Sequence, residues 1–146
     1  MGPSLVLLLF AFALLARSSD EKAAVDAAQS LFDAMAAHDA AAIRRVLLPD
    51  ARFYAVRDDR LPTSTAGEAF ASQIGAATGG IVERFTSPPR VLIHGRIAQV
   101  WGEYVFLRDG KLNHCGVDSF SLLKTSEGWK IAAIEYTAET TGCKAP

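Results

Sequence analysis

The sequence lacks the features that mark several large functional classes. Its net charge is only −1 with 21% charged residues, so it has no excess of basic side chains for binding nucleic acid. It has no glycine-rich phosphate loop, no Ser-His-Asp signature, no internal repeat and no low-complexity tract. Its three histidines, His38, His94 and His114, share no metal-ligand spacing. We therefore expect no metal or other cofactor and no nucleic-acid partner.

Long apolar runs are also lacking, apart from residues 5–16 near the N-terminus. This run is too short to span a bilayer comfortably, and small residues at Ala16 and Ser18 have the spacing that a signal peptidase recognises. The sequence therefore predicts a signal peptide over residues 1–18 and one domain over residues 19–146. Such a protein is secreted or periplasmic, and makes no membrane contact after signal cleavage. An uncleaved anchor is the alternative, because no Lys or Arg precedes the run.

Cysteine is scarce, and the chain has only Cys115 and Cys143. In an oxidising compartment two cysteines favour a disulfide, which would tie the C-terminal tail to the body of the domain. In the chain-entropy model such a closure stabilises the fold by roughly 3–4 kcal/mol. The alternative is two unrelated thiols, one buried in a strand and one in a loose tail.

The first half of the domain has mainly helical patterns. Apolar spacing predicts helices over residues 20–37 and 40–48, the second one stopped by Pro49. A short strand over residues 52–56 and a charged loop follow, and the capping-box spacing at Thr65 opens a helix that runs to residue 77. His38 falls in a connection and is expected to be solvated.

The second half has strand after strand. Strands are predicted over residues 82–86, 90–94, 97–107, 113–123 and 129–137, and Asp109-Gly110 is a strong signal for a two-residue hairpin. Helices followed by a meander of long strands indicate an α+β fold.

A candidate pocket face follows from counting residues back from the two hairpin turns. The Asp109-Gly110 turn places Trp101 opposite Asp118, and a three-residue last turn places Asp118 near Tyr136. One face then collects Trp101, Glu103, His114, Asp118, Phe120, Ile134 and Tyr136. A one-residue slip would move a whole strand to the other face.

The polar members of this face suggest proton transfer. A carboxylate in an apolar cavity has its pKa raised by desolvation, and a second carboxylate nearby raises it further. Asp118 or Glu103 could then act as a general base, with Tyr136 donating to an oxyanion. The alternative is that these groups only hydrogen-bond one another and keep the pocket mouth polar.

The order of elements resembles the nuclear transport factor 2-like superfamily, with its SnoaL-like and ketosteroid-isomerase-like members. The resemblance is carried by Phe32 and Met35, by residues 47–54, by Val100 to Tyr104 and by Gly128 to Ile131. It implies N-terminal helices packed in the concavity of a strongly curved antiparallel sheet, a cystatin-like cone. It also adds Phe32 and Tyr54 to the expected ligand-binding set. The strand from His114 and the terminal Gly142-Cys143 are similar to a secreted bacterial subgroup.

The resemblance also implies a homodimer through the outer face of the sheet. The sequence places an apolar set on that face, namely Val100, Tyr104, Phe106, Val117, Leu123, Trp129 and Ile131. The alternative is that the tail held by Cys143 covers part of it.

Three functions remain open. The first is binding of a small, mainly apolar molecule in the cone. The second is a cofactor-independent lyase or isomerase, dehydratase-like, that works by general acid–base catalysis. The third is a non-catalytic dimeric interaction module, because fold alone does not decide function.

Overall fold

The computed structural model describes residues 3–144, with side chains described for residues 19–144. The predicted signal peptide therefore lies outside the residues whose side chains are described. In the described part of the chain, no helix is long and apolar enough to cross a membrane. The helices are α1 (Pro3–Ala36), α2 (Ala40–Val46) and α3 (Gly67–Ala76). The strands are β1 (Leu47–Arg57), β2 (Arg60–Ala66), β3 (Ile81–Phe85), β4 (Arg90–His94), β5 (Ile97–Arg108), β6 (Lys111–Thr125) and β7 (Gly128–Thr137).

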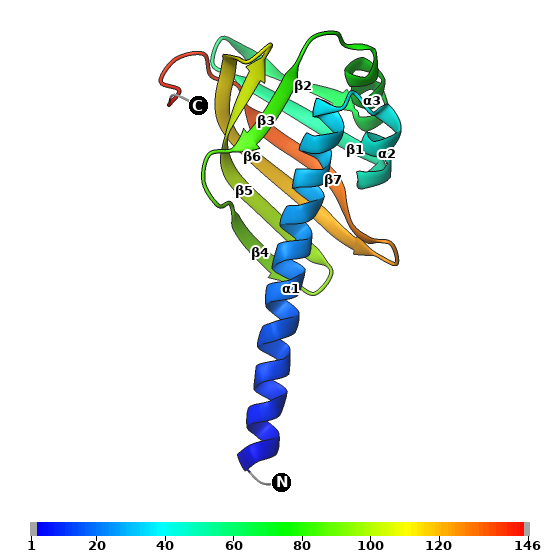
Figure 1. The fold of residues 1–146 in the computed structure, drawn as a ribbon, viewed down its shortest axis with the longest axis vertical. Coiled ribbons are helices and arrows are strands. Elements are labelled where there is room, and N and C mark those ends of the chain that lie inside the picture. The colour runs from blue at the N-terminus through cyan, green and yellow to red at the C-terminus, as the bar shows by residue number, and fades with distance from the viewer. Residues whose placement is uncertain (1–2, 145–146) are drawn as a thin grey trace.

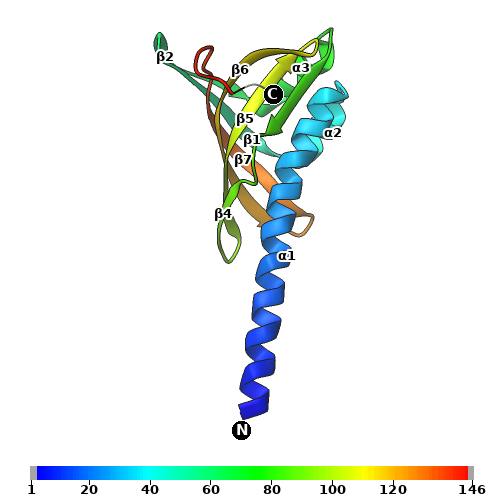
Figure 2. The same cartoon turned by 60° about the vertical axis from the view of Figure 1, so that its left-hand side comes forward.

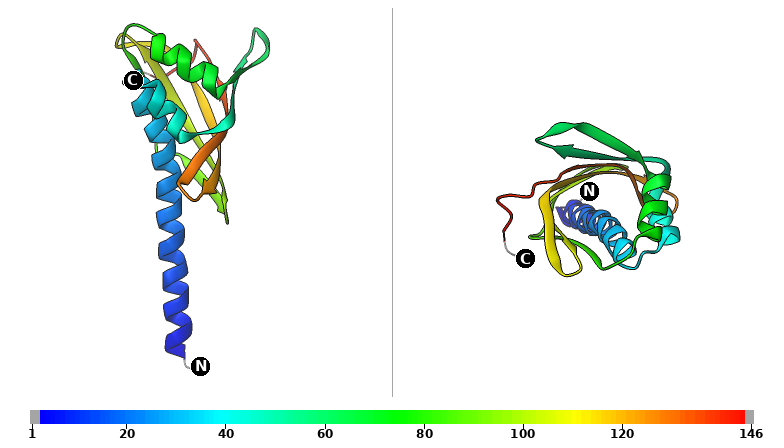
Figure 3. Two further views of the ribbon diagram at one scale, coloured as in Figure 1. Left: turned by 90° about the vertical axis from the view of Figure 1, so that its right-hand side faces the viewer. Right: turned by 90° about the horizontal axis from the view of Figure 1, so that it is seen from above.

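The strands form one curved sheet in the order β2-β1-β7-β6-β5-β3, with β4 also pairing with β5. Neighbouring strands are antiparallel except β1 and β7, which are parallel. The sheet bends around α1, while α2 and α3 lie to one side of it (Figures 1 and 2). The view from above shows α1 inside the concavity (Figure 3). The predicted α+β cone is confirmed.

The core lies between α1 and the concave, inner face of the sheet. The rings of Phe32, Phe85 and Phe120 meet edge to face, with centroids 5.1 to 6.1 Å apart. Phe32 comes from α1, Phe85 from β3 and Phe120 from β6, so one aromatic cluster joins the helix to two separate strands. Such edge-to-face pairs stabilise a core beyond the burial of their area.

The helix ends differ in part from the prediction. Asp39 caps α2 by accepting a hydrogen bond from the Ala42 amide at 2.8 Å, and the chain becomes extended at Leu47, before Pro49. The capping box predicted before α3 is wrong, since its cap residue is Ala66 and has no side-chain bond. Glu68 instead accepts hydrogen bonds from Arg44 of α2 at 2.6 and 2.7 Å.

The expectation that His38 is solvated is wrong, because its ring contacts two backbone carbonyl oxygens. Its Nδ1 lies 3.0 Å from the Ile74 carbonyl oxygen and its Nε2 lies 2.8 Å from the Gly79 carbonyl oxygen. Its backbone φ is +52°. The ring therefore ties the α1–α2 connection to the end of α3 and to the loop that follows.

Strand β2 is not predicted by the sequence, which indicates a charged loop after β1. The predicted charged loop contains a tight turn at Asp58 and Asp59, after which the chain pairs back along β1. Nearly every residue of β2 is exposed, so the strand has no apolar alternation to reveal it. As an edge strand it tolerates Pro62. The β1–β2 hairpin projects from the body of the domain (Figure 3).

The predicted register between β5 and β6 is wrong by one residue. The turn itself is as predicted, with positive φ at Asp109 and Gly110 and Arg108 opposite Lys111. A bulge then follows, because Leu107 pairs with Leu112 but Phe106 pairs with His114. Because β6 has one extra residue at this bulge, each β5 residue before Leu107 lies on the opposite face of the sheet from the one predicted.

This shift exchanges the faces of β5. Trp101 lies opposite Ser119 and Glu103 opposite Val117, both on the convex, outer face, while Tyr104 and Phe106 point inward. The predicted outer set is therefore wrong at Val100, Tyr104 and Phe106, and also at Trp129 and Ile131, which belong to the core. The large apolar residues exposed on the outer side of β4, β5 and β6 are Leu92, Ile97, Trp101 and Leu123.

The hairpin of β6 and β7 has the predicted pairing at Asp118 and Phe120, although its turn differs from the predicted one. Its turn has two residues instead of three, with Thr125 opposite Gly128, and a bulge in β7 later restores the count. Phe120 consequently pairs with Ile134, and Asp118 with Tyr136, as predicted.

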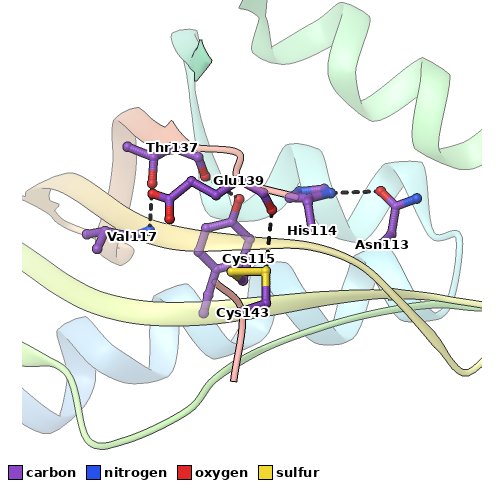
Figure 4. Close-up of a disulfide and its surroundings, with 8 residues drawn as sticks. Asn113, His114, Cys115, Val117, Thr137, Glu139 and Cys143 are labelled. Carbon is purple, nitrogen blue, oxygen red and sulfur yellow. Dashed lines mark hydrogen bonds between the residues drawn. A yellow bond between two sulfur atoms is a disulfide. The ribbon is translucent and has the colours of Figure 1, made fainter. Parts of the chain in front are cut away.

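The predicted disulfide joins Cys115 and Cys143, with their Cα atoms 5.7 Å apart. Figure 4 shows the bond beside Glu139, whose backbone pairs with Cys115 on β6. The tail after β7 is thus held on the outer face of the sheet. Lys144 reaches Glu103 at 3.2 Å, so the tail covers this end of the outer face and leaves Trp101 54% exposed.

Candidate functional site

A cavity of about 160 Å³ lies between α1, α3 and the inner face of the sheet. Its walls are mainly apolar, with a cluster of polar groups contributed by the strands. The lining residues are Leu31, Met35, Phe53, Phe70, Ile74, Glu83, Tyr104, Phe106, His114, Asp118, Ile134 and Tyr136.

Four residues of the predicted set line this cavity, namely His114, Asp118, Ile134 and Tyr136. The others lie elsewhere. Phe32 and Phe120 belong to the packed aromatic cluster of the core, Tyr54 points outward from β1, and Trp101 and Glu103 lie on the outer face. Whether the four lining residues bind a ligand stays a prediction.

The cavity holds a pair of carboxyl groups, from Glu83 and Asp118. They come from β3 and β6, which are separated in the sheet by β5, and the concave bend brings their side chains within hydrogen-bonding reach. Asp118 is 1% exposed and is the only polar residue fully buried among the described residues. Neither carboxylate has an ion-pair partner in the described part of the chain.

Glu83 was not identified from the sequence, although a signal was present. Ile81, Glu83 and Phe85 alternate along one face of β3, so the glutamate sits between two apolar residues on an inward face. A carboxylate on an inward face is a stronger indication of a functional site than an exposed one, because burial of a charge is costly.

Burial keeps a proton on this pair. Desolvation raises the pKa of Glu83 to about 7, against a smaller lowering by its hydrogen bond with Asp118. Desolvation also raises the pKa of Asp118 well above its usual range, helped by the charge of Glu83 and the hydrogen bond between them. Asp118 Oδ2 is buried and receives no hydrogen bond from an N–H or O–H donor of the described residues. A carboxylate without donor or cation is unfavourable there, so the proton resides on Asp118, which donates to Glu83.

Two phenols lie beside the carboxyl pair. The Tyr104 hydroxyl donates to the Thr137 carbonyl oxygen at 2.6 Å, and burial raises its pKa far above the ordinary value. Burial also raises the pKa of Tyr136, against a smaller lowering by the nearby Arg57 guanidinium. Both phenols remain protonated and can donate hydrogen bonds at neutral pH.

His114 is a neutral member of the cavity wall. Its ring stacks on Phe106 with centroids 4.7 Å apart, and its Nδ1 lies 2.8 Å from the Asn113 side-chain oxygen (Figure 4). Burial, and to a lesser degree the charge of Arg57, lowers its pKa. The ring is therefore uncharged at neutral pH and serves as a flat, weakly polar surface.

The cavity can hold a small molecule and exchange protons with it, because one wall offers a carboxyl donor, a carboxylate acceptor and a phenol. The residues with described side chains contain no cluster of three or more His, Cys, Asp or Glu side chains able to hold a metal ion.

The comparisons with known proteins agree with this architecture. Residues 19–137 match the model of the family described as "Putative lumazine-binding". A search of curated proteins gives no match. Among solved structures, an NTF2-like protein with a cystatin-like fold from Novosphingobium aromaticivorans has 17% identity and a TM-score of 0.71, with 90% of each chain covered.

Two further solved structures are similar over most of their length. An NTF2-like superfamily protein from Salmonella enterica serovar Typhimurium has 14% identity and a TM-score of 0.70, covering 87% of this chain and 96% of that one. A "putative dehydratase from the NTF2-like family" of Streptomyces avermitilis has 19% identity and a TM-score of 0.68, covering 84% and 97%. The chain belongs to the family described as "Putative lumazine-binding", and it shares its fold with the NTF2-like proteins.

Proposed function

We propose that the protein binds a small, mainly apolar molecule in the cavity of the cone, with a polar group of that molecule against Glu83 and Asp118. The observation that carries this proposal is the pair of Glu83 and the buried Asp118, which has no ion-pair partner among the described residues and lies in a mainly apolar wall. Such a pair destabilises the empty fold, and perturbed carboxyl groups in a hollow are typical of functional sites.

The size of the cavity limits the ligand to about one ring. At about 160 Å³ it is close to the roughly 150 Å³ of an engineered apolar cavity, in another protein, that binds benzene. The aromatic side chains of Phe53, Phe70 and Phe106 offer flat apolar surfaces to such a ring. Because the family description names lumazine, that compound is also a test ligand, although its two fused rings exceed the size that the cavity volume favours.

A methyl NMR titration tests this proposal. Benzyl alcohol and lumazine are added to the protein, and binding in the cavity should shift the methyl signals of Leu31, Ile74 and Ile134. An Ile74→Trp variant fills the cavity and should abolish those shifts, while Leu92→Trp on the outer face is the matched control. Shifts that persist in Ile74→Trp, or no cavity shifts with either compound, would contradict the proposal.

Acid–base catalysis is the second candidate, and the pKa of Glu83, about 7, favours it. A base poised near neutral pH suits proton transfer. In an isomerisation the Glu83 carboxylate would take a proton from a carbon beside a carbonyl group, while the Asp118 O–H would turn from Glu83 to donate a hydrogen bond to the carbonyl oxygen. Glu83 would then return the proton to a second carbon, so no cofactor is consumed. The sequence-based prediction named Glu103 as the second carboxylate beside Asp118 and Tyr136. Glu103 lies on the outer face, so in this proposal Glu83 takes that role.

The variant Asp118→Asn separates the two candidates. A binding protein should keep its affinity within a few-fold, because the amide still donates a hydrogen bond. An isomerase or dehydratase should lose most of its rate, because the amide cannot share a proton with Glu83. Equal rates in the two proteins would exclude catalysis by this pair.

Export is part of the proposal. The predicted signal peptide ends at residue 18 and the family match begins at residue 19, while the disulfide suits an oxidising compartment. Mass spectrometry of the protein from the exported fraction should give the mass of residues 19–146 less two hydrogens. A mass that includes residues 1–18 would contradict cleavage.

A homodimer through the outer face is proposed as well. The supporting observation is the exposed apolar set formed by Leu92, Ile97, Trp101 and Leu123. Sedimentation velocity should show a dimer that Trp101→Glu converts to a monomer. A monomeric wild type would leave the non-catalytic interaction-module hypothesis without support on this surface.

A further inference from the structure

Arg57 lies near one end of the cavity, outside its lining residues, and has no ion-pair partner among the described residues. Arg57 is the last residue of β1 and follows Phe53 and Ala55 along the inward-facing side of that strand. It is half-buried, Ala55 two residues before it pairs with Tyr136, and its charge opposes the rise that burial causes in the pKa of Tyr136. Its charge also acts on Tyr104 and His114, so it lies close to three groups that line the cavity.

The neighbouring acidic groups do not pair with it. Among residues 19–144 no carboxylate lies within ion-pair distance of Arg57, whereas Asp59 is engaged by Arg60 at 2.6 and 2.9 Å. Inside the cavity, Asp118 is protonated and His114 is neutral. The Arg57 guanidinium therefore has no carboxylate within ion-pair distance, and the cavity-lining groups on which its charge acts, Tyr104, His114 and Tyr136, are uncharged.

Arg57 borders a second hollow, on the outside of the cavity. This groove of about 410 Å³ lies between the β1–β2 turn and the C-terminal tail, with Thr140 and Thr141 on its wall. A ligand group bound at Arg57 can thus remain hydrated while the rest of the ligand is buried in the cavity. Asp58 and Glu139 border the same groove, so it suits a single negative charge and not a polyanion.

We propose that Arg57 binds a carboxylate on the molecule whose apolar body fills the cavity, so that the ligand is a small monocarboxylic acid. The guanidinium offers a planar pair of donors that matches a carboxylate, and a partly desolvated pair of this kind is stronger than an exposed one. The apolar body then lies toward Phe53 and Ile134, with its far end near Asp118. This inference rests on the proposed function, because it needs a ligand in the same cavity.

The probes for the test are benzoate and benzyl alcohol, which share a ring and differ in charge. Both are titrated at about pH 6 into the wild type, Arg57→Met and Arg52→Met, with the methyl signal of Ile134 reporting cavity binding. Arg52 is exposed on the same strand, pointing away from the cavity, and its variant makes the same change in net charge. We expect Arg57→Met to weaken benzoate binding about tenfold or more, and benzyl alcohol binding less than about threefold. Arg52→Met should change neither.

The outcomes separate the two proposals. If both probes bind and Arg57→Met weakens them equally or not at all, the carboxylate site is excluded and the cavity function stands. If Arg52→Met weakens benzoate binding as much as Arg57→Met, general electrostatics explain the effect and the inference fails. If neither probe reaches the cavity of the wild type, the proposed function fails and this inference fails with it.

Discussion

Glu83 on β3 and Asp118 on β6 meet on the inner face of the sheet, with β5 running between their strands. A flat sheet would hold these carboxyl groups apart, since neighbouring strands are about 5 Å apart and these two are not neighbours. The bend of the cone brings inward side chains of separate strands together. The curvature that makes room for α1 therefore also creates the carboxyl pair.

The pair should make stability depend on pH. Because the pKa of Glu83 is raised from 4.5 to about 7, folding favours its protonated form. This contribution to stability, about 3 kcal/mol, is complete below pH 4.5 and is lost as the pH rises through about 7. Urea unfolding of Glu83→Gln should lack this loss and show higher stability than the wild type at pH 8. A Glu83→Gln variant that is less stable than the wild type at that pH would contradict the account of this pair.

Carboxylate binding should follow the same ionisation. As Glu83 loses its proton around pH 7, a negative charge enters the cavity and opposes benzoate. Arg57 stays cationic, the lowered pKa of His114 keeps it neutral, and the raised pKa values of Tyr104 and Tyr136 keep both phenols protonated. Isothermal titration should show benzoate affinity falling from pH 6 to pH 8 in the wild type and staying level in Glu83→Gln. A parallel fall in both proteins would rule out Glu83 as the titrating group.

Removal of the disulfide should destabilise the fold. The bond closes a loop with a sequence separation of 28, for which chain entropy gives about 3–4 kcal/mol. The double variant Cys115→Ser and Cys143→Ser should unfold at lower urea, and reductant should lower the wild type to the same midpoint. A midpoint unchanged by reductant would show that the bond adds no stability.

The Gly116→Ala substitution in β6 should lower the free energy of unfolding more than a glycine-to-alanine change at an open position. A Cβ at Gly116 would overlap the carbonyl oxygen and the side-chain oxygen of Thr137. The Thr137 carbonyl oxygen accepts a hydrogen bond from the Tyr104 hydroxyl at 2.6 Å, and its side-chain oxygen accepts one from the Val117 amide at 2.9 Å. We expect a loss of more than about 2 kcal/mol in unfolding free energy. Gly80→Ala is the matched control, because its Cβ would meet nothing closer than 3.7 Å and should cost about 1 kcal/mol or less.

The sequence predicts the fold well because strand patterns and turn residues act locally. Asp109-Gly110 defines its hairpin turn, and the helix ahead of His38 ends within one residue of the prediction. The pairings of Asp118 with Tyr136 and of Phe120 with Ile134 also follow, although a shorter turn and a bulge offset one another.

The site was only partly predictable, and the reason is a single extra residue. The bulge near Asn113 has no marker such as glycine, yet it decides whether Trp101 and Glu103 or Tyr104 and Phe106 face the cavity. Glu83 and Arg57 could not be placed by hairpin counting either, because Glu83 enters the cavity through the curvature of the sheet and Arg57 comes near it through the parallel pairing of β1 with β7.

The most direct test of the buried carboxyl pair is a carbon-13 NMR titration of the side-chain carboxyl carbons of Glu83 and Asp118, with Glu83→Gln and Asp118→Asn giving the assignments. We predict a Glu83 midpoint near pH 7 and an Asp118 signal that stays protonated well above the usual range of an aspartate. If both carbons instead titrate near pH 4, the cavity contains two ordinary carboxylates, and the proposed proton chemistry is wrong.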